Sequence, residues 1–456
     1  MMRCFPIRQL SRQACWLLCC LPLLGHAADE RLRFSGFASF GVAKSLERDE
    51  LFGESGNTIP YKTEYRDFSK LGLRVTADLH DKLSFTAQMV ALGNQDFKPE
   101  FDWIFASYNL NPNLVLHVGK YVTSYFMYSD YVDISYAYQW VTAPDAVYNR
   151  GINKTLDGAK LVWNARLGSW TSELSLLVGE DESDLSRAGI DSTLNLENGT
   201  GFAWQLDRDW LSLRTAYLRS KTTTDLGGSS LDSNLLLPGL AMQLQPVLAA
   251  YPGAAASLAT ALASPTSSTF RDSLDWHSDS AEFLSAGMTM NFGPVFIGSE
   301  ITHTEINDMI AVGPQNSGYL MIGGHLPANV TIAATFYDKR GQVNEDILED
   351  YDDFITAASN EAYTTEFANS ADPVAAQTAA SLTELAMVIY GEALEQTLTA
   401  IQKQRRQGVS LSTRWDFHSN AALKIEYLTE INKRYQPGSP NKTTPQAIRV
   451  GVDLAF

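Results

Sequence analysis

The stretch from Tyr121 to Trp140, YVTSYFMYSDYVDISYAYQW, carries the residues most suited to a functional site. It has six tyrosines, one phenylalanine and one tryptophan, and its only charged residues are Asp130 and Asp133. Tyrosine packs its ring against protein while its hydroxyl stays in water. The stretch follows neither a period of 2 nor one of 3.6, which excludes a regular strand or helix. We expect a wet, aromatic, acidic loop whose tyrosines pack against protein or stack on ring-shaped solutes.

Residue patterns typical of enzymes are absent from the sequence. Six histidines follow residue 27, and none has the spacing of an H-E-x-x-H metal site. No G-x-S-x-G motif marks a nucleophile. We expect no catalytic residue, no metal site and no cofactor. A hydrolase assembled from neighbouring strands stays open as an alternative, because catalytic triads are defined by geometry.

Residues 1–27 have the composition of a secretory signal peptide. Arg3, Arg8 and Arg12 form a basic region, and residues 15–24 (CWLLCCLPLL) form an apolar run too short to cross a membrane. We expect cleavage after Ala27. All four cysteines lie in this segment, so the exported chain has neither disulfides nor thiol chemistry.

The charge of the remaining chain excludes one class of partner. Without the three arginines of the signal, 32 Lys and Arg stand against 52 Asp and Glu, a net charge near −20. This sign disfavours nucleic-acid binding, which relies on cationic contacts to phosphate. No run of 18 or more apolar residues remains, so we expect no membrane-spanning helix.

Apolar and polar residues alternate over most of the chain. In KLGLRVTADLH, Leu71, Leu73 and Val75 alternate with Arg74 and Thr76, the period of a strand with one apolar face. We expect sixteen such strands, near residues 31–45, 69–80, 83–92, 101–110, 114–120, 157–165, 169–179, 201–207, 210–220, 281–292, 295–305, 317–325, 329–340, 407–417, 421–431 and 446–456.

Short and long connections alternate between these strands. Seven joins are tight turns, such as Asn111-Pro112-Asn113 and Gly293-Pro294. Eight joins are mostly long and cover residues 46–68, 93–100, 121–156, 180–200, 221–280, 306–316, 341–406 and 432–445. This order and an even strand count are typical of an outer-membrane barrel, whose closure leaves no unpaired edge in lipid. The sequence predicts an all-β, transmembrane antiparallel barrel over residues 28–456, with short periplasmic turns and long extracellular loops.

A soluble β-sandwich or a large secreted barrel also alternates in this way. The membrane barrel is favoured by aromatic residues near strand ends, which suit the interfacial girdles of a membrane protein: Phe34, Phe40, Trp103, Trp163, Trp170, Trp204, Tyr217, Phe292, Trp415, Tyr427 and Phe456. An eighteen-stranded barrel stays open, because the loops 221–280 and 341–406 are long enough to hide a pair of strands.

Two long loops have helical patterns of their own. Residues 234–264 are rich in Ala and Leu and predict short helices broken at Pro238 and Pro252. Residues 374–402 place apolar side chains at helical spacing, which predicts an amphipathic helix. We expect these pieces to pack on each other and cap the barrel mouth; entry into the lumen is the alternative. The acidic run at residues 345–353 (EDILEDYDD) is expected to be a solvated face, with bridging of divalent cations to lipopolysaccharide as the alternative.

The chain resembles the sixteen-stranded porins of Gram-negative outer membranes in its signal, its strand and loop order and its terminal Phe456. Residues 118–149, VGKYVTSYFMYSDYVDISYAYQWVTAPDAVYN, are similar to the third-loop region of a subgroup of porin-like proteins. The resemblance implies that loop 121–156 folds inward and narrows the channel. It further implies that Phe456 is read by the barrel-assembly machinery, that the chain is a homotrimer, and that it sits among outer-membrane lipid and lipopolysaccharide.

Basic residues gather on the polar faces of five strands that are consecutive around a closed barrel. We expect them to form a basic pore wall that faces the acids of the loop across a narrow aqueous gap, giving a transverse field that selects solutes. The wall consists of Arg33, Lys70, Arg74, Arg414, Lys424 and Arg449. The constriction loop contributes Tyr125, Tyr128, Asp130, Tyr131, Asp133, Tyr136, Tyr138 and Asp145. The alternative for each basic residue is an ordinary pair with a neighbouring acid.

These observations predict an outer-membrane porin that lets small hydrophilic solutes diffuse passively. A substrate-selective channel for sugars, phosphate or organic acids is the alternative, and composition does not separate the two. A plugged transporter is disfavoured, because no globular plug domain precedes the first strand near Leu32.

Overall fold

The structure, a computed structural model, describes residues 31–48, 52, 59–148, 154–184, 193–225, 279–307, 313–436 and 439–456. The expected signal peptide and the expected helices at 234–264 lie outside these residues. The first nine strands are β1 (Leu32–Ser45), β2 (Lys70–His80), β3 (Leu83–Leu92), β4 (Pro99–Asn111), β5 (Leu114–Val122), β6 (Thr155–Leu167), β7 (Trp170–Asp184), β8 (Thr193–Arg208) and β9 (Leu211–Asp225). The others are β10 (Asp279–Phe292), β11 (Val295–Ile306), β12 (Gln315–Leu326), β13 (Val330–Gly341), β14 (Gln404–His418), β15 (Ala421–Gln436), β16 (Ser439–Thr443) and β17 (Gln446–Ala455).

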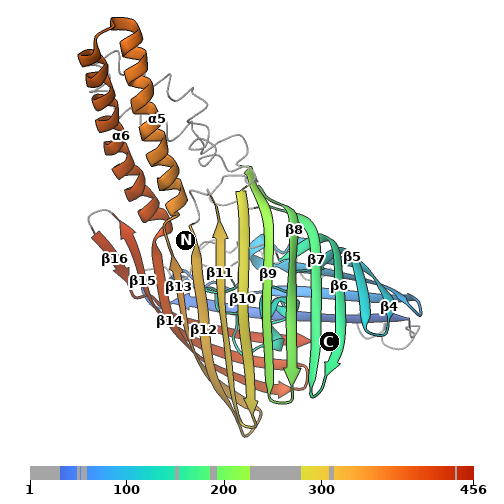
Figure 1. The fold of residues 1–456 in the computed structure, drawn as a ribbon. Coiled ribbons are helices and arrows are strands. Elements are labelled where there is room, and N and C mark those ends of the chain that lie inside the picture. The colour runs from blue at the N-terminus through green and yellow to red at the C-terminus, as the bar shows by residue number, and fades with distance from the viewer. Residues whose placement is uncertain are drawn as a thin grey trace, which may run out of the picture.

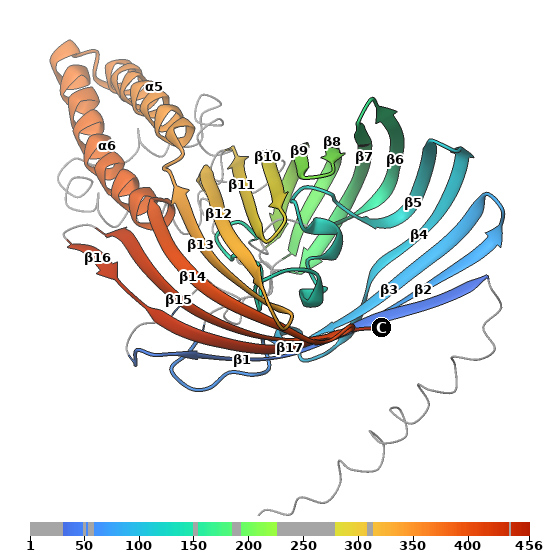
Figure 2. The same cartoon turned by 90° about the horizontal axis from the view of Figure 1, so that it is seen from below.

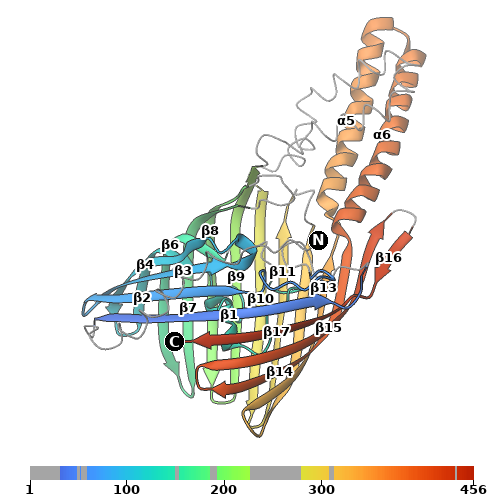
Figure 3. The ribbon, with the colours of Figure 1, turned by 180° about the vertical axis from the view of Figure 1, so that it is seen from behind.

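Sixteen of these strands form one closed antiparallel barrel (Figures 1 and 3). Each strand from β1 to β15 pairs with the next, and β17 closes the ring by pairing with both β15 and β1. The five-residue β16 pairs only with the end of β15 and lies outside the ring. The predicted count of sixteen is therefore confirmed, and the eighteen-stranded alternative is wrong.

The two faces of the barrel follow the alternation in the sequence. Outward side chains such as Leu176, Val178 and Ile301 are apolar and remain half or more exposed. An apolar outer belt of this kind matches lipid rather than water. Trp103, expected at an outer girdle, instead lies on the inner face, where the Arg74 guanidinium sits 4.0 Å from its ring centroid.

The β7–β8 hairpin is longer than predicted. β8 begins at Thr193, eight residues before the expected strand, and β7 continues to Asp184. These added residues pair with each other beyond a register shift next to Gly179. Much of the predicted loop 180–200 is thus a strand extension above the rim.

Two helices occupy the connection between β13 and β14. They are α5 (Glu345–Ser370) and α6 (Pro373–Gln402), and the second confirms the predicted amphipathic helix. α5 covers the run that was expected to be only an acidic solvated face. Figures 1 and 2 show the two helices side by side as an arm that projects from the rim, so neither the predicted cap nor entry into the lumen is observed for them. Among the described residues, neither helix is long and apolar enough to cross a membrane.

Candidate functional site

The loop after β5 enters the barrel instead of covering its mouth. Figure 2 shows it inside the ring of strands, with the short helical turns η3 (Ser129–Tyr131) and η4 (Ser135–Ala137). It reaches the opposite end of the barrel, because the Tyr136 hydroxyl donates to the carbonyl of Ser419 in the tight β14–β15 turn, at 2.7 Å. The loop thus runs along the lumen toward the end with short turns.

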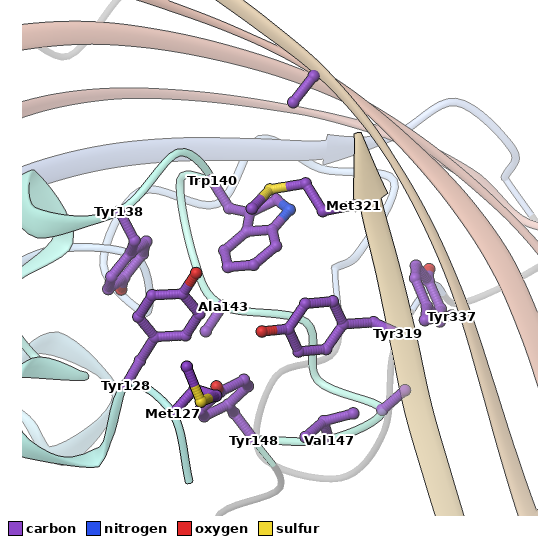
Figure 4. Close-up of a cluster of buried hydrophobic side chains, with 12 residues drawn as sticks. Met127, Tyr128, Tyr138, Trp140, Ala143, Val147, Tyr148, Tyr319, Met321 and Tyr337 are labelled. Carbon is purple, nitrogen blue, oxygen red and sulfur yellow. The ribbon is translucent and has the colours of Figure 1, made fainter. Parts of the chain in front are cut away.

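Most aromatic side chains of the loop are buried in packing. Figure 4 shows Tyr128, Tyr138, Trp140 and Tyr148 gathered against Tyr319 of β12. The Trp140 ring meets Tyr128 and Tyr319 edge-on, with centroids 5.6 and 5.4 Å away. Edge-to-face contacts of this kind add stability beyond buried area. The tyrosine content of the loop is explained mainly by this core.

The remaining predicted tyrosines have two different environments. Tyr125 is 1% exposed, packs near Phe283, and accepts a 2.5 Å hydrogen bond at its carbonyl from Ser285 of β10. Tyr131 and Tyr136 are only partly buried. These two therefore keep part of their surface exposed.

Polar contacts tie the second half of the loop to β13. The Trp140 Nε1–H donates to Thr335 Oγ1 at 2.8 Å, and the Gln139 amide donates to the Thr331 carbonyl at 3.2 Å. Both partners lie on the inner face of β13, where the loop buries them. A buried donor without such a partner would destabilise the fold by about 1–3 kcal/mol.

Glu300 of β11 joins the two ends of the loop. Its carboxylate accepts from the Met127 backbone N–H at 2.9 Å and from the Tyr148 hydroxyl at 2.5 Å. The side chain is 1% exposed. Burial raises the pKa of the Tyr148 hydroxyl well above its usual value, so this group stays a proton donor to Glu300.

Four of the six predicted wall residues contact the loop directly: Arg449, Lys424, Arg414 and Lys70. Arg449 lies 3.0 Å from Asp145 and donates to Thr142 Oγ1 at 2.7 Å. Lys424 donates to the carbonyls of Ser135 and, at 2.9 Å, Trp140. Arg449 and Lys424 are 1% and 0% exposed, so the aqueous gap expected beside them is not observed. These long cationic side chains satisfy loop oxygens that burial would otherwise leave unpaired.

Arg414 makes the third direct contact. Its guanidinium donates to the carbonyls of Tyr136 at 2.6 Å and Tyr138 at 3.0 Å, and it also pairs with Asp416 at 2.7 Å. The same group lies 4.8 Å from the Tyr136 ring centroid. Arg414 therefore fixes the deepest part of the loop.

Lys70 makes the fourth direct contact with the loop, whereas Arg33 and Arg74 have partners elsewhere. Arg33 pairs with Asp78 and is well exposed, and Arg74 donates to Gln88 Oε1 at 2.9 Å. Lys70 reaches the carbonyl of Val132 at 3.4 Å. The six basic residues thus do not form one continuous wall.

Two of the three acids of the loop, Asp130 and Asp133, face a different part of the barrel, from β4 to β9. Asp130 pairs with Arg214 of β9 at 2.9 Å and keeps 42% of its side chain exposed. Lys160 of β6 contributes a second positive charge toward Asp130. Burial opposes ionisation of Asp130, but the Arg214 guanidinium outweighs it and holds the pKa of Asp130 below its usual value.

Asp133 belongs to a three-residue network. Lys154 pairs with Asp133 and, at 2.6 Å, with Asp102 of β4. Burial alone would lower the pKa of Lys154, but Asp133 and Asp102 raise it above the usual value, so the lysine stays charged. This network holds the loop near its return to β6.

Arg214, Lys160, Lys154, Asp102 and Glu300 were missed by sequence reasoning. Lys160, Arg214 and Glu300 sit at inward positions of alternating strands, which was the available signal. Asp102 lies at a register shift of β4 beside Trp103, so alternation does not mark it. That signal marks the inner face only, and many inward residues are far from the loop. Partner identity depends on which strands the closed ring places opposite the loop.

Phe456 ends the chain beside the first strand. Its backbone N–H donates to the Gly36 carbonyl at 2.9 Å and its carbonyl accepts from the Gly36 N–H at 2.6 Å. A Cβ at position 36 would lie 2.7 Å from the Phe456 ring, so glycine permits this contact. The residue therefore completes the β1–β17 seam; its role as an assembly signal stays a prediction.

An open recess of about 610 Å³ lies at the end with short turns. Arg166, Asp207, Ser212 and Asn291 are among the residues around it. Asp207 accepts from both Gln205 and Ser212. In the described part of the chain, no group of three or more His, Cys, Asp or Glu side chains is arranged to hold a metal ion.

Comparisons with known proteins give likenesses in structure alone. No protein-family model matches the chain, and no curated protein does. The outer membrane channel DcaP of Acinetobacter baumannii superposes with a TM-score of 0.50 and 9% identity, over 93% of this chain and 97% of that chain. The anion-selective porin of Comamonas acidovorans gives 0.49 and 12% over 93% and 99%, and OprB of Pseudomonas putida gives 0.48 and 10% over 97% of each. The chain therefore has the fold of the sixteen-stranded outer-membrane porins.

Proposed function

We propose that this chain is an outer-membrane porin through which small hydrophilic solutes diffuse passively, with loop 121–156 as its constriction. The closed barrel, apolar outside and polar inside, supports a water-filled path across lipid. We propose that residues 1–27 direct export and that the mature chain is a homotrimer among lipid and lipopolysaccharide. No catalytic step or cofactor enters this mechanism.

The asymmetry of the loop carries the proposal. Its Thr142–Asp145 and Ser135–Trp140 parts bind the β13–β17 side through buried contacts. Its Asp130 edge keeps 42% exposure and faces Arg214 and Lys160. We infer that solutes pass on the β4–β9 side, along the exposed part of the Asp130 carboxylate and not between Asp130 and Arg214, which are in contact at 2.9 Å.

The packing of the loop bears on the choice between a general and a selective channel. Tyr125, Tyr128 and Tyr138 are at most 8% exposed and so offer no ring face to a solute. Only Tyr131 and Tyr136 among the predicted tyrosines keep partial exposure. This distribution favours a general diffusion pore over a channel that stacks sugars along an aromatic path.

Planar-bilayer recording of the purified chain tests the proposal. We expect discrete conductance steps with a linear current–voltage relation, and no block by millimolar sugars. Deleting Tyr125–Tyr138 is expected to increase single-channel conductance, because it removes the segment that occupies the lumen. Silent bilayers from folded, heat-modifiable protein would contradict the channel, and an unchanged conductance after the deletion would contradict the constriction. Saturable block by one solute class would favour the selective alternative.

A further inference from the structure

The arm formed by α5 and α6 is internally packed and does not depend on the lumen. Ile347, Tyr351 and Phe354 of α5 are buried, at 2% exposure or less. The Tyr351 hydroxyl donates to the Met387 carbonyl of α6 at 2.6 Å. A Cβ at Gly391 would lie 2.7 Å from the Tyr351 ring, so glycine lets the helices approach. The arm is therefore a built antiparallel pair, roughly 45 Å long at about 1.5 Å per residue of α6.

α6 has a second stripe that this packing leaves uncovered. Seven positions spaced alternately by four and three residues are all exposed: Val374, Thr378, Ser381, Leu385, Val388, Glu392 and Glu395. Val374, Leu385 and Val388 are 72%, 58% and 45% exposed. Spacing of this kind matches the seam along which one helix packs on another. We name these seven residues the outer seam.

The charge of the arm restricts what can cover the outer seam. Residues 345–402 contain twelve Asp and Glu and no Lys or Arg. A second copy of the arm would bring twelve acids against twelve, and an anionic lipid surface would be repelled in the same way. A cationic partner is instead attracted, with Glu384, Glu392 and Glu395 beside or within the seam.

We propose that the outer seam of α6 is a docking site for a basic amphipathic helix of another protein. Apolar residues of that helix would cover Val374, Leu385 and Val388, and its Lys and Arg would lie over the glutamates. Because the arm projects from the rim and stands clear of the lumen, a helix bound to the outer seam would lie outside the pore. This inference does not rest on the proposed conduction.

The test uses the full chain in nanodiscs and two synthetic 18-residue peptides of Lys and Leu. One peptide has Leu at helical i, i+3, i+4 and i+7 spacing, and the other has the same composition without an apolar face. We expect the amphipathic peptide to bind at least tenfold tighter by calorimetry at physiological salt. Equal affinity for both peptides would show that binding comes from unspecific charge attraction alone, and this result would overturn the proposal.

Two further variants localise the site. L385Q with V388Q is expected to weaken binding at least tenfold, whereas F367Q, which changes an exposed apolar residue of α5 outside the seam, should leave it unchanged. Conductance should stay as in the parent chain for both. An unaffected affinity in the double variant would refute the seam. Deleting residues 234–264, an uncharged stretch of this chain, should not strengthen binding; a marked gain would identify that stretch as the occupant instead.

Discussion

Arg449 of the last barrel strand and Asp145 of the third long loop lie 304 residues apart in sequence and 3.0 Å apart in space. Glu426 of β15 lies 3.8 Å from the same guanidinium, and the rings of Phe52 and Phe68 flank it. One buried cation thus connects the end of the chain with two loops from its first third. The same guanidinium therefore contacts both the strands that close the barrel and the loop inside it.

Arg449→Gln should destabilise the protein strongly. It leaves Asp145 and Glu426 as buried acids without their cation, and losing one partner of a buried pair costs about 3–5 kcal/mol. We expect a clearly lower unfolding temperature in the gel assay that separates folded from heat-denatured barrels. Arg33→Gln is the matched control, because its exposed pair with Asp78 contributes at most about 1 kcal/mol. Equal shifts in the two variants would contradict the structural role of Arg449.

Glu300→Ala should loosen the constriction loop. The substitution leaves the Met127 N–H and the Tyr148 hydroxyl without acceptors, at a cost of about 1–3 kcal/mol for each buried group. We expect noisier open-channel current and a larger mean conductance. Glu300→Gln keeps one acceptor oxygen and should lie between the parent and the alanine variant. Parent-like noise in Glu300→Ala would show that other contacts suffice to fix the loop.

Asp130 should govern ion selectivity at the passage edge. Asp130→Asn is expected to shift the reversal potential in a salt gradient toward anions, and Lys160→Gln should shift it toward cations. Arg449→Gln, if folded, should change selectivity less than either, because Arg449 is buried away from solutes. Opposite signs for Asp130→Asn and Lys160→Gln are the essential result, and shifts of the same sign would exclude the proposed passage.

The pH dependence of this effect follows from the lowered pKa of Asp130. The pKa of an aspartate carboxyl is near 3.9 in the unfolded chain, and a lower pKa in the folded protein means that its ionised form stabilises the fold at pH values above 3.9. This stabilisation is lost as pH falls through the folded-state pKa. The selectivity difference between the parent and Asp130→Asn should therefore persist from pH 7 to about 4 and vanish only below it. Disappearance already between pH 5 and 6 would mean that Arg214 does not hold the carboxylate ionised.

Gly391→Val should disturb the arm without altering conduction. A side chain at this position meets the buried Tyr351 ring, whose hydroxyl is tied to Met387. Small-to-large changes in packed sites typically cost about 1–3 kcal/mol. We expect faster proteolysis within residues 345–402 and an unchanged single-channel conductance. Serine at the same position is the milder control.

The helical arm illustrates a partial success of sequence reasoning. Helical spacing in residues 374–402 predicted α6, whereas α5 was missed because nearby acids dominate its first turns. Those acids are consistent with the helix, since Glu345 and Asp346 lie at its N-terminus, where negative charge is favourable. The apolar positions of α5 became meaningful only through contact with α6. Nothing in the sequence fixed the direction in which the pair projects.

Sixteen strands and the order of short and long connections were predicted from the amino-acid pattern, whereas the exclusion of eighteen strands and the length of the β7–β8 hairpin came from the structure. Alternation with a period of 2 is a local property of each strand, so it can be recognised in the sequence without knowing the partner strand. It likewise assigned Arg449 and Lys424 to the inner face. Closure of the barrel buries these cations against the loop and brings Arg214 and Lys160 to face Asp130. Alternation specifies only the face on which a side chain lies, because its depth and its partner depend on which distant strands the closed barrel brings together.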